Sequence, residues 1–134
     1  MTTDGDAVAA LLRTRVASAP IDLPVAGDSM AGVIAAGSTV TVTAQAAPRR
    51  GEIWAFAGDD GTVIVHRVRE IEGTTVVGRG TANTLDDAPV AVERLIGRVR
   101  SANTNGATTR FGALDAVRAR LAFAARKRLR RLRR

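Results

Sequence analysis

Hydrophobic and polar residues alternate along much of the middle of the chain. Valine and threonine take turns over residues 38–43, the two-residue period of a strand with one buried face. Further extended segments are predicted over residues 52–57, 62–71, 75–79, 90–93 and 95–99. Glycine and aspartate turns separate them, most clearly at Gly58-Asp59-Asp60-Gly61, a strong hairpin motif. The pattern predicts a compact, mainly β domain.

Helical patterns occur at both ends of the chain. Near the N-terminus, Asp6 can cap a short helix over about residues 7–17, with Val8, Leu11 and Leu12 on one side. Two prolines then end the helix and favour an extended approach to the β region.

At the other end, apolar residues recur every three or four positions, which predicts an amphipathic helix over residues 110–134 with arginines on its other faces. The apolar positions are Leu114, Val117, Leu121, Ala125, Leu129 and Leu132. The segment before it, residues 101–109, is rich in Ser, Thr, Asn and Gly and is predicted to be a linker. The expected organisation is therefore an N-terminal helix and approach (1–24), a β domain (25–100), the linker, and the basic helix.

The net charge of +7 is unevenly distributed. Residues 110–134 contain ten Arg or Lys and one acid, a charge of +9, whereas residues 1–109 contain ten basic and twelve acidic residues, a charge of −2. A cationic amphipathic helix on a nearly neutral body has three interpretations: an anchor to an anionic membrane surface, a nucleic-acid contact, or a helix that docks on its own domain. Nucleic acid is the least favoured, because the segment has no base-reading or stacking features.

Composition excludes several kinds of chemistry. Without cysteine there is no disulfide framework, cysteine nucleophile or thiolate metal site, and no cofactor is expected. No run approaches the roughly 18 apolar residues of a transmembrane helix. The acidic N-terminus does not read as a secretory signal. We therefore expect a cytoplasmic protein, or one held peripherally at a membrane.

The candidate chemistry lies in a serine and a histidine. Ser29 follows Gly27-Asp28, and His66, the single histidine of the chain, lies in the segment predicted to be the third strand. A serine hydroxyl needs a base to become a nucleophile. The single lysine, Lys127, lies in the basic tail, so His66 is the conventional nitrogen base left for Ser29.

Three further residues are candidates for roles around this pair. Asp86 and Asp87 lie in the loop after the fourth predicted strand and are candidates to orient the imidazole. Met30 is a candidate substrate-binding residue. Each residue also has a plain structural interpretation: His66 in the core, Ser29 in an ordinary turn, Met30 in packing, and the aspartates in a solvated loop.

Three motifs make residues from about 23 to 99 resemble the superfamily of type I signal peptidases and LexA-like self-cleaving repressors. They are Gly27-Asp28-Ser29-Met30, Arg50-Gly51-Glu52-Ile53-Trp54-Ala55-Phe56 and Ile64-Val65-His66-Arg67-Val68. Histidine in place of lysine is similar to the archaeal and endoplasmic-reticulum signal peptidases, as is the loop Gly80–Val90 with its Asn83 and following aspartates.

The resemblance implies a coiled β domain of the signal peptidase/LexA catalytic type, with Ser29 as nucleophile and His66 as general base. It makes Asp86 the preferred orienting acid, Asp87 the second choice, and Asn83 a structural residue of the loop. The implied activity is a serine endopeptidase that cleaves a leader or signal peptide at small residues in an extended peptide or protein substrate. A non-catalytic peptide-binding relative is one alternative, favoured by Thr81, where the family usually has an acid, and by the lack of its usual proline after Met30. A small regulator that uses its arginine-rich tail is another.

Overall fold

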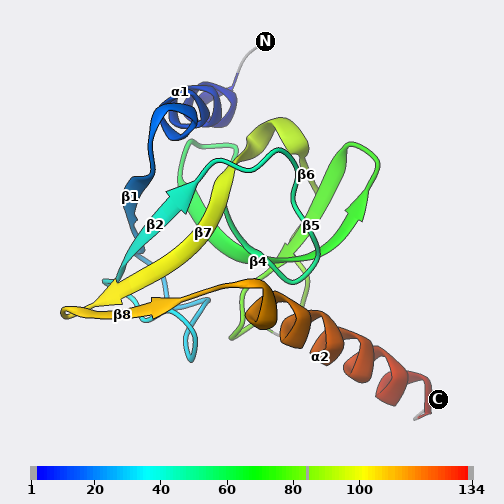
Figure 1. The fold of residues 1–134 in the computed structure, drawn as a ribbon. Coiled ribbons are helices and arrows are strands. Elements are labelled where there is room, and N and C mark those ends of the chain that lie inside the picture. Colours follow the sequence, from blue (N-terminus) through cyan, green and yellow to red (C-terminus); the bar gives the residue numbers. More distant parts are fainter. Residues whose placement is uncertain (1–2, 84, 133–134) are drawn as a thin grey trace.

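The computed structural model describes residues 3–83 and 85–132, without the side chains of residues 129–131. The described chain is built from the following elements: α1 (Asp4–Ser18), β1 (Ile21–Pro24), β2 (Thr39–Thr43), β3 (Ile53–Ala57), β4 (Val63–Glu72), β5 (Thr75–Arg79), β6 (Val90–Ala91), the 3-10 helix η1 (Val92–Arg94), β7 (Leu95–Thr104), β8 (Ala107–Arg110) and α2 (Ala113–Leu132). The strands form one antiparallel sheet in the order β1-β2-β7-β3-β4-β5-β6, and β8 pairs with β7. The sheet curls into an open half-barrel (Figure 1). The predicted mainly β fold with a helix at each end is confirmed.

The segment expected as a linker forms part of the sheet instead. Residues 101–104 continue β7, and β8 returns beside it, so that Ser101 pairs with Arg110. The turn between them is Asn105-Gly106, with φ values of 51° and 86°. Asn-Gly is favoured where both central residues of a tight hairpin need positive φ, and this motif outweighs the linker-like composition.

Helix α1 packs on the sheet through a narrower face than predicted. Thr3, rather than Asp6, is the N-cap, and the Asp6 carboxylate completes a capping box with it. Ala9 and Val16 are buried and Leu12 packs on the core, whereas Leu11 is 56% exposed. Arg94 ties the start of the helix to the body by binding the carboxylates of Asp6 and Asp59.

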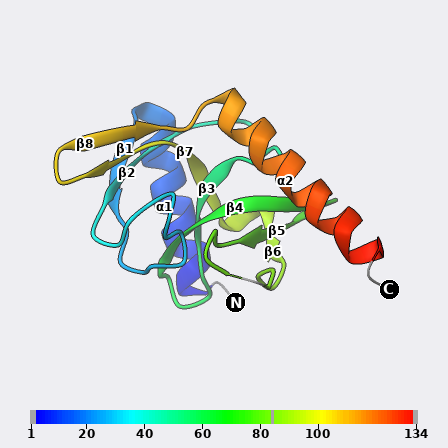
Figure 2. The same ribbon diagram turned by 90° about the horizontal axis from the view of Figure 1, so that it is seen from below.

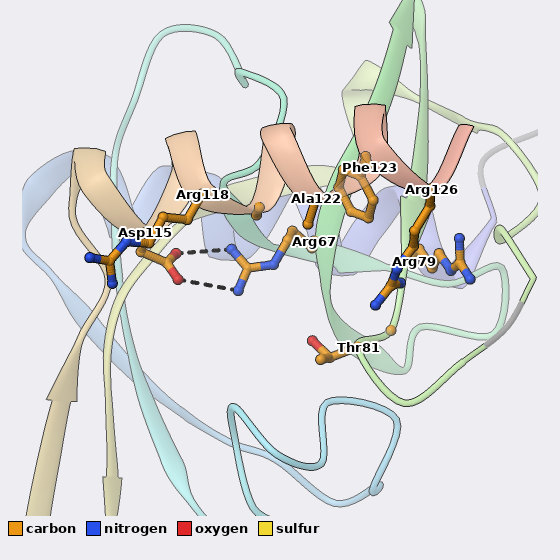
Figure 3. A pocket seen from close by; sticks show the side chains of 10 residues that line it. Arg67, Arg79, Thr81, Asp115, Arg118, Ala122, Phe123 and Arg126 are labelled. Carbon is orange, nitrogen blue, oxygen red and sulfur yellow. Dashed lines mark hydrogen bonds and ion pairs between the residues drawn. The ribbon is translucent and has the colours of Figure 1, made fainter. Parts of the chain in front are cut away.

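Helix α2 leaves the sheet at the end of β8 and runs past β4 and β5, away from α1 (Figure 2). The buried Arg67 of β4 binds the Asp115 carboxylate of the helix at 2.9 Å (Figure 3). A Cβ on Gly51 would lie 2.1 Å from the carbonyl oxygen of Ala116, so only glycine allows this close approach. The first turn of α2 is thus docked on the body.

The predicted apolar stripe of α2 does not make this contact. The helix is buried through Ala116, while Leu114, Leu121 and Leu132 are 63%, 63% and 77% exposed. The side chain of Leu129 lies outside the described residues. These leucines therefore face solvent, as do arginines such as Arg120 and Arg128.

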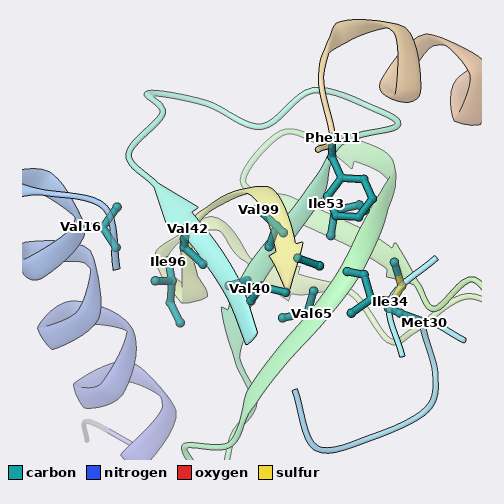
Figure 4. Packing of buried hydrophobic residues seen from close by; sticks show 12 residues of the cluster. Val16, Met30, Ile34, Val40, Val42, Ile53, Val65, Ile96, Val99 and Phe111 are labelled. Atoms are coloured by element: carbon teal, nitrogen blue, oxygen red, sulfur yellow. The ribbon is translucent and has the colours of Figure 1, made fainter. Parts of the chain in front are cut away.

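The core lies on both sides of β3, the strand between β7 and β4. Ile53 and Ala55 point into the larger apolar cluster (Figure 4), and Trp54 and Phe56 point into a second one. Alternate residues of an extended strand face opposite sides, so all five residues of β3 are buried. The neighbouring Glu52 is 4% exposed, and its carboxylate pairs with Arg98 at 2.8 Å. Burial lowers the pKa of Arg98.

Candidate active site

Ser29 lies in the loop between β1 and β2, next to a buried anchor. The Ala31 amide donates to the Asp28 carbonyl at 2.9 Å, and the Ile34 amide donates to the Met30 carbonyl at 2.7 Å. These bonds form tight turns around the serine. The Met30 side chain is 1% exposed and belongs to the larger core cluster, which leaves Ser29 half-buried at the surface of the loop.

The Met30 side chain lies in the core, and the substrate-binding role expected of this residue stays a prediction. Its sulfur accepts hydrogen bonds from the Thr81 amide at 3.4 Å and the Thr81 hydroxyl at 3.5 Å. A side chain held in this way packs the serine loop on the domain.

His66 is held by the sheet. It lies in β4 opposite Trp54 of β3 and is 8% exposed. Its ring meets that of Phe56 edge to face, with 6.0 Å between the ring centroids. Strand pairing and aromatic packing together fix the plane of the imidazole and restrict its contact with water.

The serine and histidine side chains meet. Ser29 Oγ lies 2.8 Å from Nε2 of His66, although 37 positions separate the residues in sequence. The other ring nitrogen, Nδ1, is hydrogen-bonded to the Asp87 carboxylate. A neutral imidazole with its proton on Nδ1 donates to that carboxylate and accepts from the serine hydroxyl. The three side chains are thus in the order hydroxyl, imidazole, carboxylate.

The acid at the ring is Asp87, not the preferred Asp86. The Asp87 amide donates to the Gly78 carbonyl of β5 at 2.8 Å, which brings its side chain to the neighbouring His66. The Asp86 carboxylate faces Arg69 at 3.5 Å and Arg79 at 3.9 Å. Consecutive side chains in this extended part of the loop point to different sides, so only one of the two can reach the imidazole.

The loop after β5 also packs against the backbone of Ser29. The Ala82 amide donates to the Ser29 carbonyl at 2.9 Å, and the Asn83 amide donates to the Gly80 carbonyl at 2.9 Å. A Cβ on Gly80 would lie 2.5 Å from the Ser29 carbonyl oxygen and 2.9 Å from Ser29 Cβ. Asn83 therefore has a structural place in the loop, as the resemblance implied. Sequence reasoning did not identify Gly80 as a contact of the serine, since no motif marks which glycine touches it.

Backbone donors are available beside the hydroxyl. Within residues 3–83 and 85–132, the amides of Ser29 and Met30 have no hydrogen-bond acceptor. Free N–H groups next to a nucleophile are the donors that an oxyanion requires. In the same described ranges, no three His, Cys, Asp or Glu side chains are grouped to hold a metal ion.

A curled antiparallel sheet that brings a serine hydroxyl to a buried imidazole has the organisation of a serine-type peptidase. The chain belongs to the Peptidase S24-like family, whose family model matches residues 6–79. This match includes Ser29 and His66 and ends before Asp87. A search of curated proteins found no match. The recognised superfamily is thus confirmed at the level of this family, and the finer likeness to serine–histidine signal peptidases stays a prediction.

Family membership indicates serine-type peptidase activity in general. None of the described helices is long and apolar enough to cross a membrane.

Proposed function

We propose that the protein is a serine endopeptidase in which Ser29 is the nucleophile, His66 the general base and Asp87 the acid that orients the imidazole. The observation that carries this proposal is the 2.8 Å approach of Ser29 Oγ to His66 Nε2. This distance is within the range needed for direct proton transfer. The part-buried carboxylate contact at Nδ1 supports it, because it selects the tautomer that leaves Nε2 free to accept.

The geometry supports a two-stage acyl transfer. As Ser29 Oγ attacks the peptide carbonyl carbon, its proton passes to Nε2 of His66, and the imidazolium is stabilised by Asp87. The Ser29 and Met30 amides are the proposed donors to the oxyanion. His66 then gives this proton to the departing amine, which leaves the acyl group on Ser29 Oγ. In the second stage His66 takes a proton from water as the water oxygen attacks the acyl carbon, and the proton passes to Ser29 Oγ when its bond to that carbon breaks.

The proposed substrate is an extended peptide segment cleaved at small residues, such as the leader of a secreted or matured protein. This part of the proposal follows the resemblance to signal peptidases. Extended substrates of such enzymes commonly bind by adding a strand next to the site.

The test is cleavage of peptides containing Ala and Gly segments, together with labelling by a serine-reactive phosphonate. Ser29→Ala and His66→Ala should abolish both cleavage and labelling while circular dichroism shows a folded domain. Ser18→Ala, at the exposed end of α1, is the matched control and should keep both. Unchanged turnover in Ser29→Ala refutes the proposal, and peptide binding without turnover in the wild-type protein supports a non-catalytic relative instead.

We also propose that the outward face of α2 contacts an anionic membrane surface. Leu114, Leu121 and Leu132 are exposed on a helix whose single acid, Asp115, is already paired with Arg67. Leucines can enter the interfacial region while the surrounding arginines attract lipid phosphates. Exposed leucines on a cationic helix therefore complement both the apolar interior and the negative charge of an anionic membrane surface.

Vesicle co-sedimentation tests this contact. The protein should bind vesicles containing phosphatidylglycerol and not vesicles of phosphatidylcholine alone, and Leu114→Ser combined with Leu121→Ser should weaken binding about tenfold or more. Leu11→Ser on α1, also at an exposed leucine, is the control. Equal binding by the double variant and the wild type would show that the leucines do not enter the bilayer.

A further inference from the structure

An arginine-lined cavity of about 260 Å³ lies between α2 and the β4–β5 part of the sheet (Figure 3). The sheet contributes Arg67 and Arg79, and the helix contributes Arg118 and Arg126. Ala122 and Phe123 give the helix side an apolar surface. The volume suits one amino-acid side chain rather than a large ligand.

The cavity has an excess of positive charge. One acid, Asp115, lines it, and this carboxylate is already bound by Arg67 at 2.9 Å. In the part of the chain that the structure describes, no carboxylate lies within ion-pair distance of Arg118 or Arg126. An anion with a short apolar stem would match both the guanidinium groups and the apolar wall.

The cavity adjoins the proposed nucleophile. Gly80 and Thr81 form part of its lining, and a Cβ on Gly80 would be 2.9 Å from Ser29 Cβ. An extended peptide advances about 3.3 Å per residue. Arg67 follows His66 in β4, so their side chains leave opposite faces of the strand. A substrate whose carbonyl carbon lies at Ser29 Oγ would therefore have to pass over Gly80 and Thr81, at the end of β5, to place a nearby residue in the cavity.

We infer that this cavity is a specificity subsite for a carboxylate of the substrate, supplied by an Asp or Glu side chain a few residues from the cleaved bond. The inference rests on the proposed peptidase function, because it assumes that Ser29 marks where the peptide binds. It adds an acidic residue to the small residues expected at the cleavage site.

Binding to the full-length Ser29→Ala protein tests the subsite without requiring turnover. Fluorescent peptides of one sequence carry Glu, or its neutral isostere Gln, at each position in turn around an Ala-rich centre. One Glu position should bind about tenfold more tightly than Gln, as expected for a charge-assisted contact. Peptides with a free or an amidated C-terminus show whether a terminal carboxylate replaces the side chain, and dependence on the free terminus alone would overturn the inference.

Matched arginine variants separate the cavity from general charge attraction. Arg118→Gln with Arg126→Gln should remove the preference for Glu, whereas Arg120→Gln with Arg128→Gln removes the same charge outside the cavity and should keep it. Equal loss in both pairs, or no preference in the parent protein, overturns the inference. If the wild-type protein cleaves no peptide but the preference and its loss are observed, the peptidase proposal fails while the subsite stands. If it cleaves Glu and Gln peptides equally, with equal binding, the subsite fails alone.

Discussion

Replacing Gly80 by alanine should disable the site through a contact that involves none of the three reactive side chains. The new Cβ would lie 2.5 Å from the Ser29 carbonyl oxygen, 2.9 Å from Ser29 Cβ and 2.8 Å from the side-chain Nδ2 of Asn83. Van der Waals contact with a carbonyl oxygen requires about 3.2 Å or more, so the loops must separate by roughly 0.5–1 Å. Gly80 does not have a positive φ, so alanine can adopt its backbone conformation. The cost of the substitution is therefore the steric clash alone.

The displaced group is the serine itself. Ser29 Oγ now lies 2.8 Å from the imidazole, and a shift of that size would carry it out of good hydrogen-bonding geometry. Misplacement by about 1 Å can cost about 100-fold in rate. We therefore expect kcat/KM for peptide cleavage to fall about 10- to 100-fold, while overpacking lowers the free energy of unfolding by about 1–3 kcal/mol.

The assay compares peptide cleavage with urea unfolding for the wild type, Gly80→Ala and Gly112→Ala. A Cβ at Gly112 meets no atom within 4 Å, so this control should keep both activity and stability. If a folded Gly80→Ala protein cleaves peptides at the wild-type rate, the reasoning is refuted. The position of Ser29 would then not depend on its close contact with Gly80.

Three further predictions concern the acid, the N-terminal helix and the core. Asp87→Asn should lower kcat about 10²- to 10⁴-fold and change the pH–rate profile, whereas Asp86→Asn should leave both close to wild type, as measured by peptide cleavage. The hydrogen bond from Arg94, followed by those from Thr3, lowers the pKa of Asp6 below its ordinary 3.8. The ionised Asp6 therefore stabilises the folded protein above pH 3.8, and this stability is lost as the pH falls through the lowered folded-state pKa. Over that pH range the free energy of unfolding, measured with urea, should fall less for Asp6→Asn than for the wild type. Phe111→Ala removes a ring that is 4% exposed in the larger cluster and should cost about 3–5 kcal/mol of unfolding free energy, measured by chemical denaturation.

The strands could be predicted because their periodicity is local. The alternating residues of β2 and the Gly-Asp turn before β4 depend on neighbours in sequence, and both predictions match the structure. The β7–β8 hairpin is equally local, but its strands lack alternating apolar residues. The polar composition of residues 101–109 therefore indicates a linker, and only the Asn105-Gly106 pair marks the turn.

The approach of Ser29 to His66 could be predicted from the sequence, whereas the choice of the carboxylate beside the imidazole could not. Ser29 and His66 could be selected because the body of the chain has no lysine and no second histidine. The choice between Asp86 and Asp87 depends on which backbone amide donates to the Gly78 carbonyl, and each insertion in the loop would change that residue. The outer face of α2 was likewise unpredictable from periodicity, because docking follows the Arg67–Asp115 pair instead of the leucines.

The loop after β5 links the two proposals physically. Gly80 of this loop lies against Ser29, and the Thr81 amide donates to the sulfur of Met30. Gly80 and Thr81 also line the arginine cavity. A carboxylate bound in the cavity would therefore contact the backbone of Gly80 and Thr81, which also supports Ser29. Binding energy gained there could be expressed in the position of the serine, so an acidic substrate residue should raise kcat as well as lower KM. An effect confined to KM would instead mean that the cavity only adds affinity and that this loop does not transmit it.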